Sequence, residues 1–121
     1  MKNFIKISTY FLAVLLIAGS VGHILNPKMS DGFIPDFLPK SIVHGLTAVV
    51  ELSLGIALLF KKYRKQAALF SVMLLSTFLV LHVIDVFRDS PVLGSQTAAI
   101  IRIPFQFLFM YMSWVVYQAK W

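Results

Sequence analysis

Long apolar stretches dominate this chain, and short polar or charged segments separate them. A helix of about 20 apolar residues crosses the hydrocarbon core of a bilayer, which is about 30 Å thick. Four stretches have this length, and we predict a helix over each of them: 4–24, 41–60, 66–87 and 97–117. The pattern therefore predicts an all-α protein, a four-transmembrane-helix bundle that forms a single domain over residues 1–121.

The composition favours lipid over water as the surroundings of these helices. Hydrophobic residues make up 59% of the chain and charged residues only 13%, whereas soluble domains contain roughly 45–50% apolar and roughly 25% charged residues. A soluble domain of this size buries too small a share of its surface to hide so many apolar side chains. The sequence has no cysteine, which excludes disulfides, a redox-active CxxC pair and thiolate metal sites.

The basic residues predict which side of the membrane each connecting segment faces. One side of a four-helix layout carries seven Lys or Arg and no acid: Lys2, Lys6, Lys61, Lys62, Arg64, Lys65 and Lys120. The other side carries three basic residues, balanced by aspartates: Lys28, Lys40 and Arg88. Because cytoplasmic loops are enriched in Lys and Arg, we predict that both termini and the 61–65 loop are cytoplasmic. The charge lies in short membrane flanks and forms no exposed basic stripe, so we expect no nucleic-acid binding.

The first helix and the segment after it each allow two interpretations. Lys2 and Lys6 before an apolar run could mark a cleaved signal peptide, but the run reaches Leu25 and is longer than a typical signal-peptide core. The segment 26–40 contains three prolines and is too apolar to float in water. We therefore expect a structured outer loop, which either anchors at the membrane surface or covers the bundle as a lid.

Polar side chains inside the predicted spans are the candidate functional residues. They come from all four helices and lie in the outer half of the bundle or near its midplane: His23, His44, Glu51, His82, Asp85, Arg102 and Gln106. A charged residue within a span costs about 2.5–3.5 kcal/mol on insertion scales, so each needs a partner. The inner half is nearly all apolar, and this asymmetry indicates a shared polar site in the outer half.

We predict an ion pair between Glu51 and Arg102, because an Arg guanidinium can bind a carboxylate through two parallel hydrogen bonds. Gln106 and His82 are expected to be hydrogen-bonding neighbours of this pair, and Asp85 is expected to pair with His82 or Arg88. Such a cluster could lock the four helices in one arrangement or hold a ligand or proton. We predict no catalytic or metal-binding residue within it.

The three histidines suggest two cofactors. Two facing histidines could ligate haem, and one histidine could hold a quinone oxygen. The Arg and Glu expected in the same pocket and the lack of a haem motif argue against haem. A quinone is therefore the cofactor that we retain as a candidate.

Several short motifs, taken in their order and spacing, resemble the DoxX-like family of bacterial four-helix membrane proteins. These motifs are Gly19-x-x-x-His23-x-x-x-Pro27, Phe33-Ile34-Pro35-x-x-Leu38-Pro39, Glu51-Leu52-x-x-Gly55 and Arg102-Ile103-Pro104-Phe105-Gln106. The resemblance implies a multi-pass protein of the bacterial inner (plasma) membrane. Because relatives are linked to oxidoreductase systems, including quinone-coupled sulfur oxidation, it also implies a non-catalytic subunit or accessory protein of a redox-related membrane complex.

The alternative function is the binding of a small ligand, a quinone or a small polar solute, in a polar pocket in the outer half of the bundle. The sequence shows no nucleophile–base arrangement, which favours a non-enzymatic role in either case. The expected partners are the lipid bilayer and either a redox enzyme or further copies of the same chain.

Overall fold

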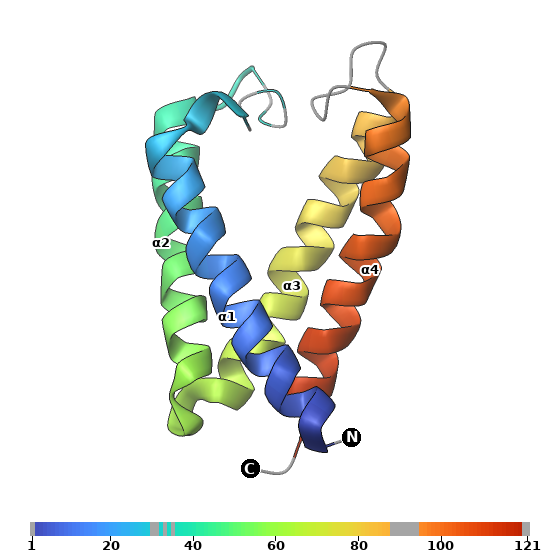
Figure 1. Cartoon of the computed structure of the whole chain (residues 1–121). Coiled ribbons are helices and arrows are strands. Elements are labelled where there is room, and N and C mark those ends of the chain that lie inside the picture. Colours follow the sequence, from blue (N-terminus) through green and yellow to red (C-terminus); the bar gives the residue numbers. More distant parts are fainter. Residues whose placement is uncertain (1, 30–31, 33, 35, 88–94, 120–121) are drawn as a thin grey trace.

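The computed structural model describes residues 2–29, 32, 34, 36–87 and 95–119, and these residues form four α-helices (Figure 1). The helices are α1 (Lys2–Leu25), α2 (Lys40–Leu59), α3 (Lys61–Val86) and α4 (Gln96–Gln118), with a 3₁₀ helix, η1 (Pro27–Met29), after α1. All four α-helices are long and apolar enough to cross a membrane. The predicted all-α, four-helix architecture is confirmed.

The corner between α2 and α3 is tighter than the sequence predicted. Residues 61–65 were expected to form a loop, but they belong to the start of α3, and Phe60 alone separates the two helices. Lys and Arg are favourable helix residues, so a basic segment need not be a loop. The Arg64 side chain closes the corner by donating to the carbonyl oxygens of Leu58 and Leu59, at 2.7 and 3.2 Å. These carbonyls end α2 and have no partner within the helix.

The helices form two antiparallel hairpins, because α1 packs mainly against α2 and α3 mainly against α4. Figure 1 shows the hairpins close together at the end where both chain termini and the α2–α3 corner lie, and apart at the opposite end. We call these the inner end and the outer end. The same splayed arrangement leaves α2 packed against α1 and α3, while α4 packs against α3 and α1.

Each hairpin is joined by hydrogen bonds from a side chain of one helix to the backbone of the other. Ser20 Oγ donates to the Ala48 carbonyl across α1 and α2, at 2.8 Å. Ser113 Oγ donates to the Ala68 carbonyl across α3 and α4, at 2.7 Å. A hydroxyl that donates to a backbone carbonyl of the neighbouring helix fixes the register of the two helices. It also leaves no polar group exposed to lipid.

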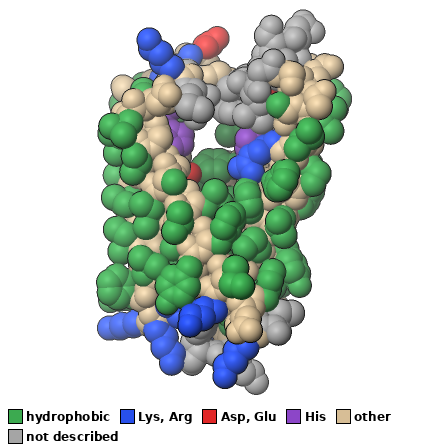
Figure 2. Space-filling model, in the orientation of Figure 1, with side chains coloured by type: hydrophobic (Ala, Val, Ile, Leu, Met, Phe, Trp, Pro, Cys, Tyr) green, Lys and Arg blue, Asp and Glu red, His purple; other side chains and the backbone are tan. Residues whose placement is uncertain are grey.

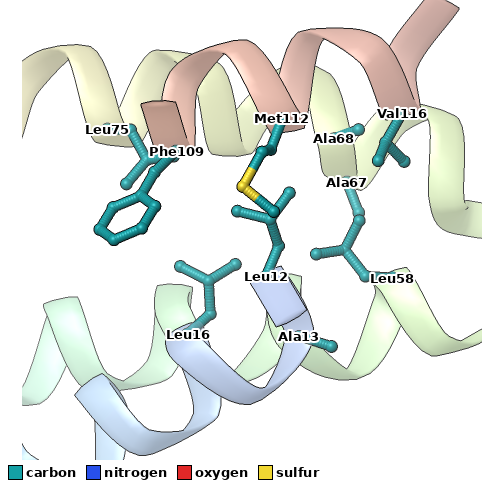
Figure 3. Close-up of a cluster of buried hydrophobic side chains, with 10 residues drawn as sticks. All are labelled: Leu12, Ala13, Leu16, Leu58, Ala67, Ala68, Leu75, Phe109, Met112 and Val116. Atoms are coloured by element: carbon teal, nitrogen blue, oxygen red, sulfur yellow. The ribbon is translucent and has the colours of Figure 1, made fainter. Parts of the chain in front are cut away.

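The apolar core lies in the inner half, where the hairpins meet (Figure 3). Its buried side chains come from all four helices: Leu12, Ala13, Leu16, Leu58, Ala67, Ala68, Leu75, Phe109, Met112 and Val116. Leu16, Leu75 and Phe109 are the core residues nearest the outer end of their helices. Beyond them the hairpins diverge, so the outer half is not closed by the same apolar packing.

Apolar side chains also cover most of the outside of the bundle. Figure 2 shows them along the flank of the helices, with Lys and Arg side chains gathered at the inner end. Exposed residues on this surface include Val14, Leu46, Met73 and Ile101. Exposed apolar surface on this scale is typical of contact with a membrane or with another protein, not with water.

Candidate functional site

A cavity of about 230 Å³ lies in the outer half, where the two hairpins diverge. Its lining comes from all four α-helices and from the segment between α1 and α2: His23, Ile34, Val43, Thr47, Phe78, Leu81, His82 and Arg102. Figure 2 shows the hollow with histidine side chains on both sides of it. The structure thus brings His23, His82 and Arg102 together, as the sequence predicted for the outer half.

The α1–α2 wall of the cavity contains a pair of hydrogen-bonded histidines. His23 Nδ1 and His44 Nδ1 are 2.8 Å apart, and their ring centroids are 5.1 Å apart. One of the two nitrogens must carry the hydrogen and the other must accept it, so the two tautomers are coupled. His44 is buried behind the wall, whereas His23 lines the cavity itself.

Glu51 lies one turn deeper on α2 than Thr47, behind the residues that line the cavity. It is only 5% exposed, and its Oε2 is 3.8 Å from His23 Nε2. Gly19 makes room for it, because a Cβ at this position would be 3.0 and 3.1 Å from the two carboxylate oxygens. Glu51 Oε2 has no hydrogen-bond partner among the described residues. A buried acceptor left without a hydrogen bond costs about 1–3 kcal/mol. Glu51 is not among the described residues that line the cavity, and it borders the cavity only through His23.

Arg102 occupies the opposite wall, on α4. Its guanidinium carbon is 5.1 Å from the centroid of the Phe109 ring, which is a cation–π contact. This contact holds the positive charge next to the core residue of α4 that lies nearest the outer end. In the described part of the chain, no carboxylate lies within ion-pair distance of Arg102. The positive charge therefore borders the cavity without a neutralising side chain among these residues.

The predicted ion pair between Glu51 and Arg102 is wrong. Glu51 instead pairs with His23 within the α1–α2 hairpin, and Arg102 contacts Phe109 on its own helix. The reason is the pairing of the helices: α2 packs against α1 and α3, and α4 against α3 and α1. The two charges belong to diagonal helices, α2 and α4.

Gln106 does not contact this pair of charges either, so its predicted role was wrong. It is fully buried, and its Nε2 donates to the Leu75 carbonyl at 2.7 Å, which joins α4 to α3. Its Oε1 is buried and has no hydrogen-bond partner among the described residues. Gln106 therefore fixes the wall that carries Arg102 rather than lining the cavity.

His82 lines the cavity on α3, and Asp85 lies one turn further toward the outer end of this helix. Asp85 is fully buried, and both Asp85 and Arg102 are close enough to His82 to interact with it electrostatically. The predicted hydrogen bond of His82 within the cluster and its predicted pairing with Asp85 stay predictions. The alternative partner of Asp85, Arg88, lies outside the described residues.

The segment between α1 and α2 contributes Ile34 to the cavity. This contact favours the interpretation of the segment as a cover over the site. Phe37, three residues later, is 84% exposed and is available as a surface anchor, so the two expected roles are not exclusive.

The chain matches a protein family over most of its length, including all the residues that line this cavity. The model of the family described as "Domain of unknown function (DUF8561)" matches residues 12–117. The chain belongs to this family. No curated protein and no solved structure matches the chain. All residues that line the cavity fall within the DUF8561 match.

Several cavity residues of this DUF8561 protein were not predicted as site residues. Thr47 could have been found, because it is three residues after His44 and four before Glu51, and therefore shares their helix face. Val43, Phe78 and Leu81 carry no such signal, since an apolar side chain facing a cavity looks the same in sequence as one facing lipid.

Proposed function

We propose that this DUF8561 protein is a four-pass protein of the bacterial inner membrane, with both termini in the cytoplasm, that binds a small ligand in its outer cavity. The proposed ligand has a compact head with hydrogen-bond acceptors, and a quinone ring is the example we favour. Membrane insertion is supported by the four apolar helices and their exposed apolar flanks. The orientation is supported by the excess of Lys and Arg at the inner end.

The observation that carries the proposal is the cavity between Arg102 on one wall and His23, which is backed by Glu51, on the opposite wall. Ionisable groups in a membrane span are costly, so their gathering around one cavity indicates a binding site. Arg102 donates hydrogen bonds only, and a protonated histidine nitrogen also donates. A quinone ring has two carbonyl oxygens on opposite sides. One oxygen could accept a hydrogen bond from Arg102 and the other could accept one from His23 on the facing wall.

The size and apolar lining of the cavity restrict the ligand further. The volume of about 230 Å³ lies below the roughly 300–1,000 Å³ of pockets for drug-sized ligands. A single ring or a short head fits this size better than a large cofactor such as haem. Val43, Phe78 and Leu81 supply apolar surface for the faces of such a ring.

The experiment that tests this function is thermal unfolding of the purified protein in neutral detergent with and without a short-chain ubiquinone. A ligand that binds only the folded protein adds about 2.7 kcal/mol of stability at 100 times its dissociation constant. We expect a melting temperature that rises with quinone concentration and saturates. A melting temperature independent of the quinone would contradict the proposal for this class of ligand.

A second candidate function is that of a non-catalytic subunit or accessory protein of a redox-related membrane complex. It is supported by the DoxX-like motifs, because His23 and Arg102 in these motifs line the cavity, while Glu51 pairs with His23 and Gln106 joins α4 to α3. Purification from native membranes in a mild detergent should then recover a redox enzyme together with the chain. Recovery of the chain alone, or of its homo-oligomer, would argue against this candidate.

A further inference from the structure

A second cavity, of about 370 Å³, lies at the inner end of the bundle, away from the proposed ligand site. Its lining comes from the first turns of α1 and from the start of α3: Lys2, Asn3, Lys6, Thr9, Tyr10 and Arg64. Lys2, Lys6 and Thr9 follow one another at i, i+4 and i+7, so they share one face of α1. The cavity therefore combines one helix face with the α2–α3 corner.

The lining of this inner cavity carries three cationic side chains and no acidic one. Of the acidic residues that the structure describes, Glu51 is near the middle of α2, Asp85 is near the outer end of α3, and Asp36 is in the connection between α1 and α2. The positive charge of the inner cavity is therefore not neutralised by any carboxylate of its own lining.

Arg64 is held in place before any ligand arrives. It is only 8% exposed, and its bonds to the Leu58 and Leu59 carbonyls fix its side chain at the corner. Lys2 and Lys6 are exposed and can adjust to a bound group. Thr9 Oγ1 donates to the Ile5 carbonyl at 2.8 Å. The site thus combines one fixed cation with two mobile ones.

We propose that the inner cavity binds the phosphate group of an anionic phospholipid. Lysine ammonium groups and the arginine guanidinium are the side chains that bind phosphate best. Basic pockets between transmembrane helices on the cytoplasmic side bind anionic lipid heads. Ile7 and Phe11, next to the lining residues on α1, are exposed and apolar and would contact the acyl chains.

This inference shares with the proposed function the insertion of the helices in a membrane, but it does not depend on the outer cavity. Phosphate could also come from a free ion, which would need no neighbouring apolar surface. The exposed apolar residues beside the cavity favour the lipid, and the two sources are separated by the probes below.

The test is native mass spectrometry of the full chain in neutral detergent, titrated with phosphatidylglycerol, phosphatidylcholine or inorganic phosphate. The double variant Lys2→Gln/Lys6→Gln removes two exposed charges and should leave the bundle folded. A basic residue near an anionic surface contributes about 1 kcal/mol, so this variant should bind phosphatidylglycerol about 30-fold more weakly. The control is Lys28→Gln/Lys40→Gln, which makes the same charge change at the outer end and should bind like the unmodified chain.

Three results would overturn the proposal. The first is equal affinity of the unmodified chain for phosphatidylglycerol and phosphatidylcholine. The second is an equal loss of phosphatidylglycerol binding in the inner and outer double variants. The third is binding of inorganic phosphate as tight as that of phosphatidylglycerol, which would assign the site to a free ion. A failed quinone test leaves all three readouts unaffected, because the two cavities lie at opposite ends of the bundle.

Discussion

Arg102→Gln is expected to abolish most of the stabilisation by a short-chain quinone while the four helices remain folded. Hydrogen bonds to a charged group contribute about 1.5–3 kcal/mol, so the loss corresponds to roughly 10- to 150-fold weaker binding. The fold should tolerate the change, because the main contact of Arg102 within the described residues is with Phe109 on the same helix. The measurement is the melting temperature as a function of quinone concentration.

The matched control for Arg102→Gln is Lys28→Gln, which removes one positive charge from the same end of the protein. Lys28 is exposed and does not line the cavity. Its variant should bind the quinone as the unmodified chain does, which separates a local hydrogen bond from a change in net charge. If Arg102→Gln binds the quinone with unchanged affinity, Arg102 does not contact the ligand and the proposed site is wrong.

Gly55→Val is expected to separate α1 from α2 and to destabilise the protein more than any single change at its surface. A Cβ at position 55 would lie 2.7 Å from Ile17 Cγ1 and 3.0 Å from the Ala13 carbonyl oxygen. The Ile17 side chain can move, but the carbonyl belongs to the backbone of α1, so the helices themselves must move apart. Overpacking of this kind lowers the free energy of unfolding by about 1–3 kcal/mol. Because the contact is with backbone, we expect the loss for Gly55→Val to lie at the upper end of this range.

Gly45→Val provides the control, because it lies on the same helix and a Cβ there would meet nothing within 4 Å. Both variants place the same β-branched residue in α2, so the difference between them measures the contact with α1. Thermal unfolding in detergent should show a clearly lower melting temperature for Gly55→Val only. Similar melting temperatures for the two variants would mean that the close approach of α1 and α2 is not as the structure has it.

The fold was predictable from the sequence because a membrane span requires little more than length and hydropathy. Four apolar stretches of sufficient length were enough to place four helices. The α2–α3 corner was misplaced because Lys61 and its basic neighbours have the composition of a loop. What makes them helical is local: Arg64 satisfies the carbonyls at the end of α2 and allows α3 to begin immediately.

The sequence predicted the depth at which the site residues lie in the bundle, but not which of these side chains contact each other. Counting along each helix placed His23, His82 and Arg102 in the same half of the bundle, and the structure brings them to one cavity. The partner of Glu51 could not be found in this way, because it depends on which helices are adjacent. The close approach at Gly19 and Gly55 brings α2 against α1, so the carboxylate meets His23 and not Arg102.

We propose that a ligand can enter the outer cavity, whose mainly apolar lining carries a few polar side chains, from outside the membrane. The chain has no cysteine, so a single Thr47→Cys can be labelled alone. Thr47 lines the cavity seven residues into α2 from its outer end, about 10 Å deep at about 1.5 Å per residue. Val80→Cys is the control at a similar depth on α3, where the side chain is 58% exposed on the apolar flank.

The decisive measurement is the labelling rate of these two cysteines in intact cells by a small, charged, membrane-impermeant thiol reagent. Because the thiolate is the reactive form, a cysteine in hydrocarbon reacts poorly. We predict that Thr47→Cys is labelled from outside the cell and is protected by a short-chain quinone, whereas Val80→Cys is not labelled. Equal rates at the two positions, or no protection of Thr47→Cys by the quinone, would contradict the account.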